Sequence, residues 1–264
     1  MGFRLAVASD THFNHVTSGE VVEVGQSAAV QHRADALLLC GDIAEAVSVE
    51  QALLDLDDGF HRPIYAVLGN HDYYQSSFKA VHEAMGTLSK RHPRITWLRT
   101  AGVVALTPTT ALVGIDGLTD GAHGDPLQGA LRMNDSRWIH DLQGLIPIRK
   151  VEVLFAKAKV DVAALERNLV KALRAFEHVI VATHVPPFAA MASEKPDYVR
   201  SWYVAKMMGD MLIKIAARFP KRKITVRCGH VHRTITVQPA ENLTASSGEA
   251  EYRYPAIHTT LELK

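Results

Sequence analysis

Short apolar runs alternate with amphipathic stretches along most of the chain. Turn residues such as Gly, Asp or His follow the apolar runs, which is typical of buried β-strands. Between the runs, apolar residues recur at helical spacing, and Ser48 and Gln51 have the spacing of a capping box ahead of one such stretch. Buried strands that alternate with helices predict an α/β layered fold. We expect strands at 3–9, 36–40, 63–68, 111–115, 179–183 and 224–228, and helices at 52–56, 77–90, 160–176 and 202–219.

The pattern changes after Gly229, where strands at 234–237, 243–246 and 256–263 follow one another without helices. This predicts a second, more antiparallel sheet. No linker or repeat divides the chain, so we expect a single domain over 1–264. Two segments fit the strand and helix pattern poorly, and long irregular segments in compact domains are usually functional. We interpret these segments, 116–150 and 186–201, as lids or inserts, with plain surface excursions as the alternative.

Composition narrows the classes of protein that need considering. The 264 residues are 47% hydrophobic and 22% charged, as in an ordinary soluble globular protein. The formal net charge is +1, which argues against nucleic acid or a membrane surface as the partner. The chain has two cysteines and no convincing signal sequence, so we expect a cytoplasmic protein. Nothing in the sequence indicates an oligomeric state.

Polar motifs that suit metal binding stand where the predicted strands end. Histidine is the commonest metal ligand, and the chain has 14 histidines. The carboxyl ends of strands in an open α/β sheet form a common crevice, so we expect these motifs to converge. In chain order they are Asp10-Thr11-His12, Gly41-Asp42, Gly69-Asn70-His71-Asp72, Thr183-His184 and Gly229-His230-Val231-His232.

The spacing within the motifs has a physical reason. Side chains two residues apart on extended backbone point to the same side, so Asp10 and His12 can reach one cation. The glycine before Asp42 lets the chain turn sharply and keeps Cβ bulk away from an ion. The Asp, Asn and His side chains of these motifs that could bind a metal are too many for one tetrahedral zinc ion. Their number suits two ions that share a carboxylate. These side chains are Asp10, His12, Asp42, Asn70, His184, His230 and His232.

The order of these motifs, from Asp10 to His232, resembles that of the calcineurin-like metallophosphoesterases. The resemblance implies a four-layer α-β-β-α sandwich, in which two mixed sheets are flanked by helices. It also implies two divalent or trivalent ions of Mn, Fe or Zn at one end of the sheets. The implied ligands are Asp10, His12, Asp42 and His232 for one ion and Asp42, Asn70, His184 and His230 for the other, with Asp42 as the bridge.

A mechanism follows from the charge of such a centre. Two cations about 3.5–4 Å apart share a water molecule, lower its pKa toward about 7 and direct the hydroxide at phosphorus. The resemblance implies that His71 binds no metal, stabilises the transition state and protonates the leaving oxygen. A histidinium needs an acid that orients it. The family often places one three residues after the bridging aspartate, here Glu45, and Asp72 is the other candidate.

The motifs do not name the substrate. Protein Ser/Thr phosphatases of the family carry Gly-Asp-X-Val-Asp-Arg-Gly and Gly-Asn-His-Glu, whereas this chain has Gly-Asp-Ile-Ala-Glu-Ala from Gly41 and Gly-Asn-His-Asp from Gly69. The family's nucleases carry basic surface, which a net charge of +1 does not support. We therefore expect a small phosphodiester or phosphomonoester, with nucleotides among the candidates. The string of motifs is similar to that of bacterial class III cyclic-nucleotide phosphodiesterases, which gives a narrower alternative.

A different alternative is a non-enzymatic, metal-binding interaction scaffold that uses the segment 116–150 as its contact surface. Retention of His71 favours catalysis, because a scaffold has no need of it. His123 and His15 are candidates for substrate binding, since each lies in a loop that should border the crevice. Further candidates for contact with a phosphate or a ring lie in or beside the irregular segments, with surface solvation or packing as the simpler interpretation. They are Arg132, Arg137, Trp138, Lys195, Tyr198, Arg200, Trp202 and Tyr203.

Overall fold

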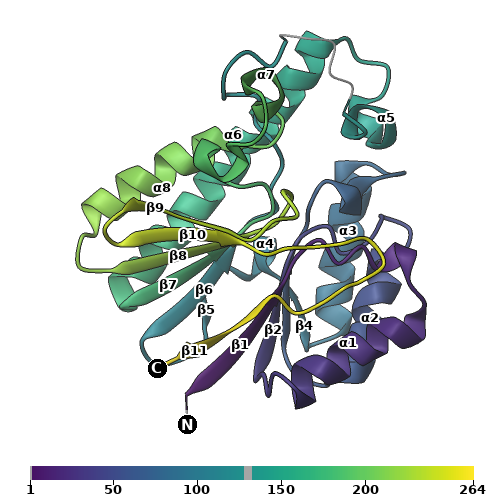
Figure 1. The fold of residues 1–264 in the computed structure, drawn as a ribbon, viewed down its shortest axis with the longest axis vertical. Coiled ribbons are helices and arrows are strands. Elements are labelled where there is room, and N and C mark those ends of the chain that lie inside the picture. Colours follow the sequence, from purple (N-terminus) through teal and green to yellow (C-terminus); the bar gives the residue numbers. More distant parts are fainter. Residues whose placement is uncertain (1, 128–132) are drawn as a thin grey trace.

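The computed structural model describes residues 2–127 and 133–264, and two β-sheets that pack face to face form its centre (Figure 1). The first sheet has the order β11-β1-β2-β3-β4 and the second the order β5-β6-β7-β8-β10-β9. The strands are β1 (Phe3–Ala8), β2 (Ala36–Cys40), β3 (Ile64–Val67), β4 (Ile95–Trp97), β5 (Val104–Ala105), β6 (Thr110–Gly114), β7 (His178–Ala182), β8 (Lys223–Cys228), β9 (Ile235–Ala240), β10 (Leu243–Ser247) and β11 (Thr259–Leu263).

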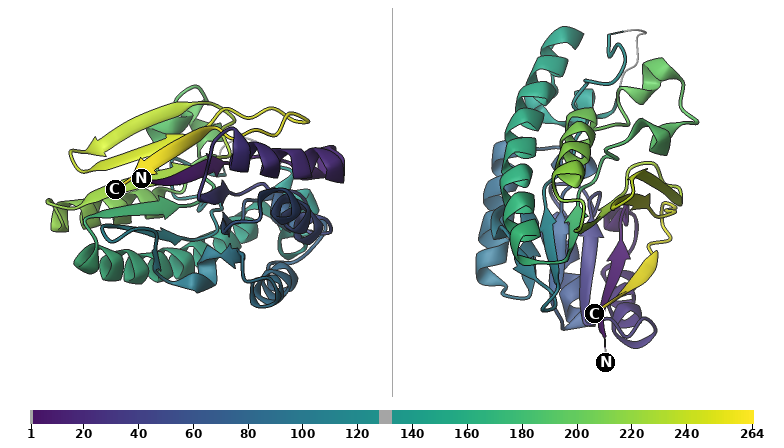
Figure 2. Two further views of the ribbon diagram at one scale, coloured as in Figure 1. Left: turned by 90° about the horizontal axis from the view of Figure 1, so that it is seen from below. Right: turned by 90° about the vertical axis from the view of Figure 1, so that its left-hand side faces the viewer.

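Helices cover the outer face of each sheet (Figures 1 and 2). The longer helices beside the first sheet are α1 (Ser18–Val30), α2 (Val49–Phe60) and α3 (Phe78–Arg91), and those beside the second are α6 (Pro147–Ala175) and α8 (Lys206–Arg218). The short helices are α4 (Leu98–Ala101), α5 (Asp135–Trp138) and α7 (Asp197–Arg200), with 3-10 turns η1 (Phe13–His15), η2 (His71–Tyr73), η3 (His140–Leu142) and η4 (Ala189–Ala192). The predicted four-layer α-β-β-α sandwich is confirmed.

The alternation of side chains along β2 shows why the layers form. All five of its residues are buried, and successive side chains of a strand point to opposite faces. Leu37 and Leu39 pack with the helices of the first sheet, whereas Leu38 packs between the sheets with Leu112 of β6 and Ile180 of β7. A strand that is apolar on both faces is buried on both, as in the central strands of covered parallel sheets.

The strands that end at the predicted motifs are parallel to one another within each sheet. β1, β2 and β3 pair in parallel, and so do β7 and β8. The carboxyl ends of these strands therefore lie at one edge of the sandwich. The segment 248–258, which links β10 of the second sheet to β11 of the first, crosses over the same edge (Figure 1).

Several sequence predictions need correction. The third late strand forms at Thr259–Leu263 but pairs antiparallel with β1 in the first sheet, so the late strands do not make a separate sheet. Ser48 does not cap α2, because its hydroxyl donates to the carbonyl of Glu45. Helix α6 begins at Pro147, inside the segment expected to be irregular, whereas α8 begins only at Lys206.

Helix α1 was not predicted from the sequence, although Thr17 and Glu20 form a complete capping box at its start. In the described part of the chain, no helix combines the length and apolar character that a membrane span requires.

Candidate metal centre

The backbone turns sharply where the motif-bearing strands end. Five of the nine described non-glycine residues with positive φ belong to the predicted ligand set, with φ between 42° and 71°. Such backbone is uncommon for residues with a side chain and costs about 1–3 kcal/mol at each position, so its concentration at one place indicates a functional site. The five are Asp10, His12, Asp42, His230 and His232.

Glycine at position 41 brings the ends of two sheets together. Its φ is +84°, and a Cβ there would lie 2.6 Å from the Cβ of His184. Real Cβ atoms do not approach so closely, so a larger residue at position 41 would push the end of β2 away from His184, which lies two residues after β7. The sequence predicts a role for this glycine in turn geometry, and the structure adds close contact between the two halves of the site.

Asp42, Asn70 and His184 form the most deeply buried part of the cluster. His184 Nδ1 lies 2.9 Å from the carbonyl oxygen of Cys40, which turns its Nε2 toward the other two side chains. That Nε2 atom is 3.3 Å from Asp42 Oδ2 and 3.2 Å from Asn70 Oδ1. Ligands about 2.1 Å from one tetrahedral ion lie about 3.4 Å apart, so this spacing fits a shared cation.

The amide of Asn70 is held in one orientation by residues that sequence reasoning missed. Its Nδ2 donates to Asp135 Oδ1 at 2.9 Å and to the Tyr74 hydroxyl at 3.2 Å. The Tyr74 hydroxyl in turn donates to the same Asp135 oxygen at 2.7 Å. With both donors of the amide occupied, Oδ1 is the atom left to face His184. Asp135 comes from α5, in a segment whose sequence gave no sign of this contact.

Asp10, His12 and His232 form the second part of the cluster. His232 Nε2 lies 3.3 Å from Asp10 Oδ1 and 3.4 Å from His12 Nε2. Asp42 Oδ2 lies 3.9 Å from His12 Nε2, so the Asp42 carboxylate faces both parts. His230 joins Asp42 and His184, because their potential ligand atoms lie within 4.8 Å of one another. All seven predicted ligands thus come together.

The donor set has the chemistry of a cation site. Asp10 Oδ2 is buried and finds no hydrogen-bond partner among the described residues, and neither does His12 Nδ1. An unpaired buried polar atom costs about 1–3 kcal/mol, so such atoms call for an explanation. Carboxylate oxygens, an amide oxygen and imidazole nitrogens that converge on one another are all electron-pair donors. A cation between the atoms that face one another, such as His12 Nε2, His184 Nε2 and Asp42 Oδ2, would be coordinated by several of them at once.

The electrostatics of the cluster also favour cation binding. Burial raises the pKa of the Asp42 carboxyl, but His184, His71 and His12 outweigh it and hold that pKa well below its usual range. Burial lowers the pKa of His12 to about 4 and, with the neighbouring His184, that of His230 to about 3. At neutral pH these two imidazoles therefore keep a free electron pair for a metal ion, and Asp42 stays ionised.

The pKa of His184 shifts in the opposite direction from those of His12 and His230. Burial lowers its pKa, but the facing carboxylate of Asp42 outweighs burial and raises the pKa to about 10. At neutral pH the ring therefore carries a proton. A metal ion bound at His184 would release that proton, as is general for sites whose ligands bind in their deprotonated forms.

His71 lies at the open side of the cluster. Its side chain is 20% exposed, whereas those of His12 and His184 are fully buried. Its ring stacks on Tyr74 with 4.3 Å between the ring centroids, and its Nε2 lies 3.9 Å from Asp42 Oδ2. A histidine that is partly accessible and close to the shared carboxylate can reach a group bound over the cluster.

Neither proposed orienting acid hydrogen-bonds to His71 among the described residues. Asp72 accepts hydrogen bonds from the backbone amides of Ile43 and Ala44 at 2.9 Å and of Gly69 at 2.8 Å. Its carboxylate thus fastens the loop after β2 to the loop after β3. Glu45 lines a separate groove between η1 and α2. The missed contact of His71 is Tyr74, three residues further on.

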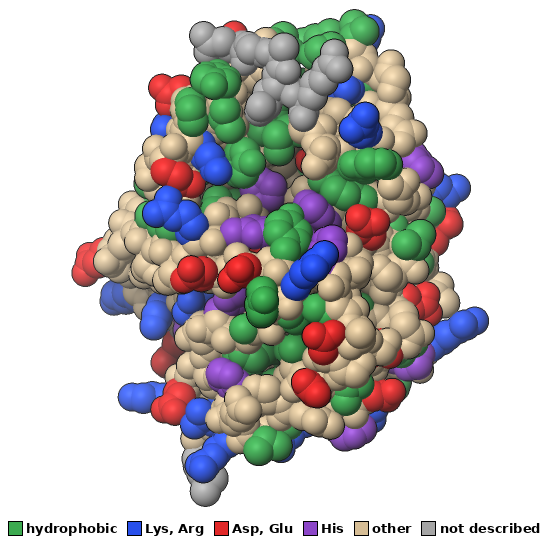
Figure 3. Space-filling model, turned by 45° about the vertical axis from the view of Figure 1, so that its right-hand side comes forward, with side chains coloured by type: hydrophobic (Ala, Val, Ile, Leu, Met, Phe, Trp, Pro, Cys, Tyr) green, Lys and Arg blue, Asp and Glu red, His purple; other side chains and the backbone are tan. Residues whose placement is uncertain are grey.

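An open pocket adjoins the cluster. It has a volume of about 400 Å³, and its floor includes Asp42, Asn70, His71, His230 and His232. On the face shown in Figure 3, histidine side chains gather in a hollow of the surface. The walls are formed by side chains from distant parts of the chain. They are Tyr74, Met133, Asn134, Lys195, Tyr203, Val231 and Tyr252.

The other candidate residues divide between the pocket and its surroundings. Of the candidates from the irregular segments, Lys195 and Tyr203 line the pocket. His15 contacts Tyr252 with 5.3 Å between ring centroids, and the carbonyl of His123 accepts a hydrogen bond from Ser201. Arg200 is engaged with an ion pair to Asp197 and with backbone carbonyls. The candidate Arg132 lies outside the described residues.

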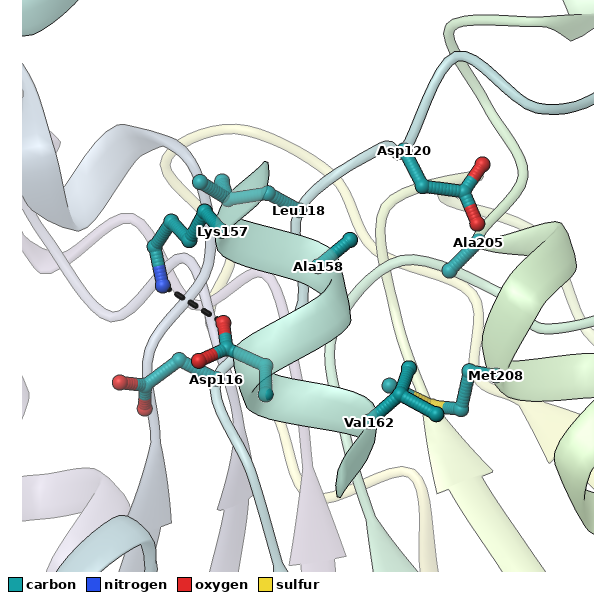
Figure 4. A pocket seen from close by; sticks show the side chains of 9 residues that line it. Asp116, Leu118, Asp120, Lys157, Ala158, Val162, Ala205 and Met208 are labelled. Carbon is teal, nitrogen blue, oxygen red and sulfur yellow. Dashed lines mark hydrogen bonds and ion pairs between the residues drawn. The ribbon is translucent and has the colours of Figure 1, made fainter. Parts of the chain in front are cut away.

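A second cavity, beneath the segment that follows β6, is too small for a substrate. Its volume is about 10 Å³, and Asp116, Asp120 and Lys157 lie around it (Figure 4). About 10–15 Å³ is the least that holds one water molecule. Lys157 pairs with Asp161 at 2.7 Å beside it. The cavity belongs to a buried charge network and does not compete with the pocket over the histidines.

An α-β-β-α sandwich with clustered Asp, Asn and His side chains below an open pocket defines a metal-dependent phosphoesterase, a hydrolase of phosphoric esters. The family model for calcineurin-like phosphoesterases matches residues 3–234. The chain therefore belongs to the calcineurin-like phosphoesterase family, as the order of motifs predicted. The family implies divalent metal ions. No curated protein sequence matches the chain significantly.

Solved structures share the fold at low sequence identity. Phosphopantetheinyl hydrolase from Mycobacterium tuberculosis is 16% identical, with 95% of this chain and 90% of that chain covered and a TM-score of 0.68. A dimetal phosphatase from Danio rerio is 13% identical, with coverage of 99% and 92% and a TM-score of 0.62. A protein from Thermus thermophilus is also 13% identical, with coverage of 94% and 90% and a TM-score of 0.56.

Proposed function

We propose that the protein hydrolyses a small phosphodiester or phosphomonoester at a dinuclear metal centre. The position of Asp42 Oδ2 carries this proposal, because the atom lies 3.3 Å from His184 Nε2 and 3.9 Å from His12 Nε2. One carboxylate oxygen thus faces both halves of the ligand set, as a bridge between two ions requires. Asp10, His12, Asp42 and His232 would hold one ion, and Asp42, Asn70, His184 and His230 the other.

Two cations held there would lower the pKa of a water molecule and neutralise charge on the phosphate during in-line displacement. The chain positions the groups that hold them. The backbone amide of His71 donates to Asp42 Oδ1 at 2.9 Å, and that of His230 donates to Asp10 Oδ1 at 2.8 Å. Each carboxylate is therefore oriented by an amide from another motif, and Asp42 Oδ2 and Asp10 Oδ1 are the oxygens that face the histidines.

His71 is the proton donor in this proposal. Its ring is accessible from the pocket and is held by its stack on Tyr74, so it can reach the oxygen of a departing alcohol. The organic part of the ester then lies in the pocket of about 400 Å³. We keep the prediction that 1–264 is a single domain, because the pocket draws on residues from Asp42 to Tyr252.

Turnover of two aryl esters tests the proposal. The purified protein is stripped with a chelator, then given Mn²⁺ and assayed with bis(4-nitrophenyl) phosphate and with 4-nitrophenyl phosphate. We expect hydrolysis only after Mn²⁺ is restored, and the faster ester identifies the preferred class. Turnover by the stripped protein equal to that of the Mn²⁺ form would contradict a metal-dependent reaction.

Metal should also stabilise the fold, which gives a readout that does not depend on substrate. A ligand at 100 times its Kd stabilises the native state by about 2.7 kcal/mol. We expect Mn²⁺ to raise the Tm of the stripped protein by several degrees and Ca²⁺ to raise it less, because imidazole ligands favour transition metals. Equal shifts with both ions would argue against the proposed histidine ligands.

The contact between Asp135 and Asn70 should set metal affinity. We expect Asp135→Leu to weaken Mn²⁺ binding about 10–100-fold, as is typical when the partner of a ligand is removed. Titration of the stripped protein against a competing chelator measures this. Asp135→Asn keeps an acceptor oxygen and should bind Mn²⁺ nearly as the wild type does. Unchanged Mn²⁺ affinity in the leucine variant would show that the hydrogen bond to Asp135 does not orient Asn70 for metal binding.

A further inference from the structure

Two tyrosines flank the histidine cluster on the pocket wall. The ring of Tyr252 lies 4.4 Å from that of His12 and 5.3 Å from that of His232, measured between centroids. The ring of Tyr203 lies 4.9 Å from that of His230. The two tyrosines thus stand beside different halves of the ligand set, and both line the pocket. Neither tyrosine holds a metal ion or moves a proton in the proposed reaction.

Tyr252 is held over the site by an anchored segment. It belongs to the crossover 248–258, whose last residue, His258, accepts a hydrogen bond from the amide of Ser9 at 2.8 Å through Nε2. The amide of His258 also donates to the carbonyl of Val7 at 2.9 Å. These contacts fasten the end of the crossover to β1, just before Asp10. Tyr252 remains 44% exposed, so part of this residue is accessible beside the cluster.

Lys195 adds a positive charge to the same wall. Its Nζ lies 4.8 Å from the centroid of the Tyr203 ring, and its side chain lines the pocket. None of the carboxylates in the described ranges pairs with it within 4.0 Å. A lysine without an acidic partner at a pocket wall attracts an anionic group of a ligand.

The pocket is larger than a phosphate group requires. Its volume is about 400 Å³. A phosphate ion occupies roughly the space of two to three water molecules, each with a share of about 30 Å³ in the liquid. Most of the pocket is therefore available to the organic part of an ester. The wall groups that this part would meet include the rings of Tyr203 and Tyr252 and the cation of Lys195.

We propose that Tyr252, Tyr203 and Lys195 bind the organic arm that stays on phosphorus when a phosphodiester is cleaved. This arm carries a flat ring and a further negative charge, as a nucleotide arm does. The proposal rests on the proposed function. In the reaction, water adds to phosphorus, the bond from phosphorus to the leaving oxygen breaks, and the leaving alcohol takes a proton. The products are the alcohol and a monoester that keeps the bound arm.

Two diesters with the same leaving group and different retained arms test this assignment. They are the 4-nitrophenyl ester of thymidine 5′-monophosphate, which retains a nucleoside arm, and methyl 4-nitrophenyl phosphate, which retains a methyl group. We expect Tyr252→Leu to raise the KM of the Mn²⁺-loaded enzyme for the nucleotide ester by about 10-fold or more, the size of a lost base stack. kcat/KM should fall at least about 10-fold more for the nucleotide ester than for the methyl ester, and Tyr252→Phe should restore the wild-type KM.

Equal losses with both esters in Tyr252→Leu would overturn the proposal, because the tyrosine would then act on the metal cluster itself. Turnover of neither ester by the wild type would overturn the proposed function together with this proposal. For Lys195, inhibition is compared between adenosine and adenosine diphosphate. Lys195→Met should weaken inhibition by the diphosphate alone, and an equal change for both inhibitors would remove Lys195 from the assignment.

Discussion

Asp42→Asn is expected to lower the metal-dependent kcat/KM by about 10³-fold. Metal ions supply several kcal/mol of transition-state stabilisation, and each 1.36 kcal/mol that is lost lowers the rate tenfold. The hydrogen bond from the His71 amide to Oδ1 keeps the amide oxygen of the asparagine in place. The NH₂ group then points where Oδ2 stood, toward His12 and His184. An NH₂ group at that position would repel both metal ions. The substitution also removes the negative charge of the carboxylate that would bridge them.

The measurement compares kcat/KM for bis(4-nitrophenyl) phosphate and the Mn²⁺ content of the isolated protein. Asp57→Asn is the matched control, because Asp57 is also buried but pairs with Arg94 at 2.6 Å, away from the candidate ligands. The control should keep its metal and its activity. Wild-type Mn²⁺ content and turnover in Asp42→Asn would contradict the bridging role.

The convergence of the candidate ligands could be predicted because its determinants are local in sequence. Each ligand follows an apolar run within a few residues, and parallel strands bring such positions to one edge. Asp72 shows the limit of that reasoning. Its place in the Gly-Asn-His-Asp string suggested an acid beside His71, yet its carboxylate binds three backbone amides. The spacing of the motif predicts the position of Asp72 in the loop after β3. The direction of its side chain depends on how that loop packs against the loop after β2.

The pocket walls could not be predicted because they depend on the path of irregular segments. Tyr252 reaches His12 only because β11 pairs with β1, which leads the crossover back across the site. Asp135 reaches Asn70 because the chain near Trp138 pairs with the backbone beside Ser76. Helix α1 was missed for a local reason, since Val22, Val24 and Gly25 are poor helix formers and its stability comes from packing on α2.

His71→Ala should reduce turnover by an amount that depends on the leaving group. General acid catalysis contributes about 10²–10⁴-fold when the departing oxygen needs a proton. We therefore expect a loss of that size for an ester of a simple alcohol. 4-Nitrophenolate leaves without prior protonation, so the loss with the aryl ester should be much smaller. A positional role for His71 would instead reduce turnover of both esters equally.

Metal content separates the two roles that the geometry allows His71. Its ligand atom lies within 4.8 Å of those of His12 and Asp42, a grouping that also suits a metal ligand. As a proton donor, His71 can be removed without loss of Mn²⁺, and the exposed His140→Ala serves as the control for the loss of a histidine. Loss of Mn²⁺ from His71→Ala alone would place His71 among the ligands. Retained Mn²⁺ together with a loss confined to the alkyl ester would support the proposal that His71, whose partly exposed ring lies beside Asp42, protonates the departing oxygen.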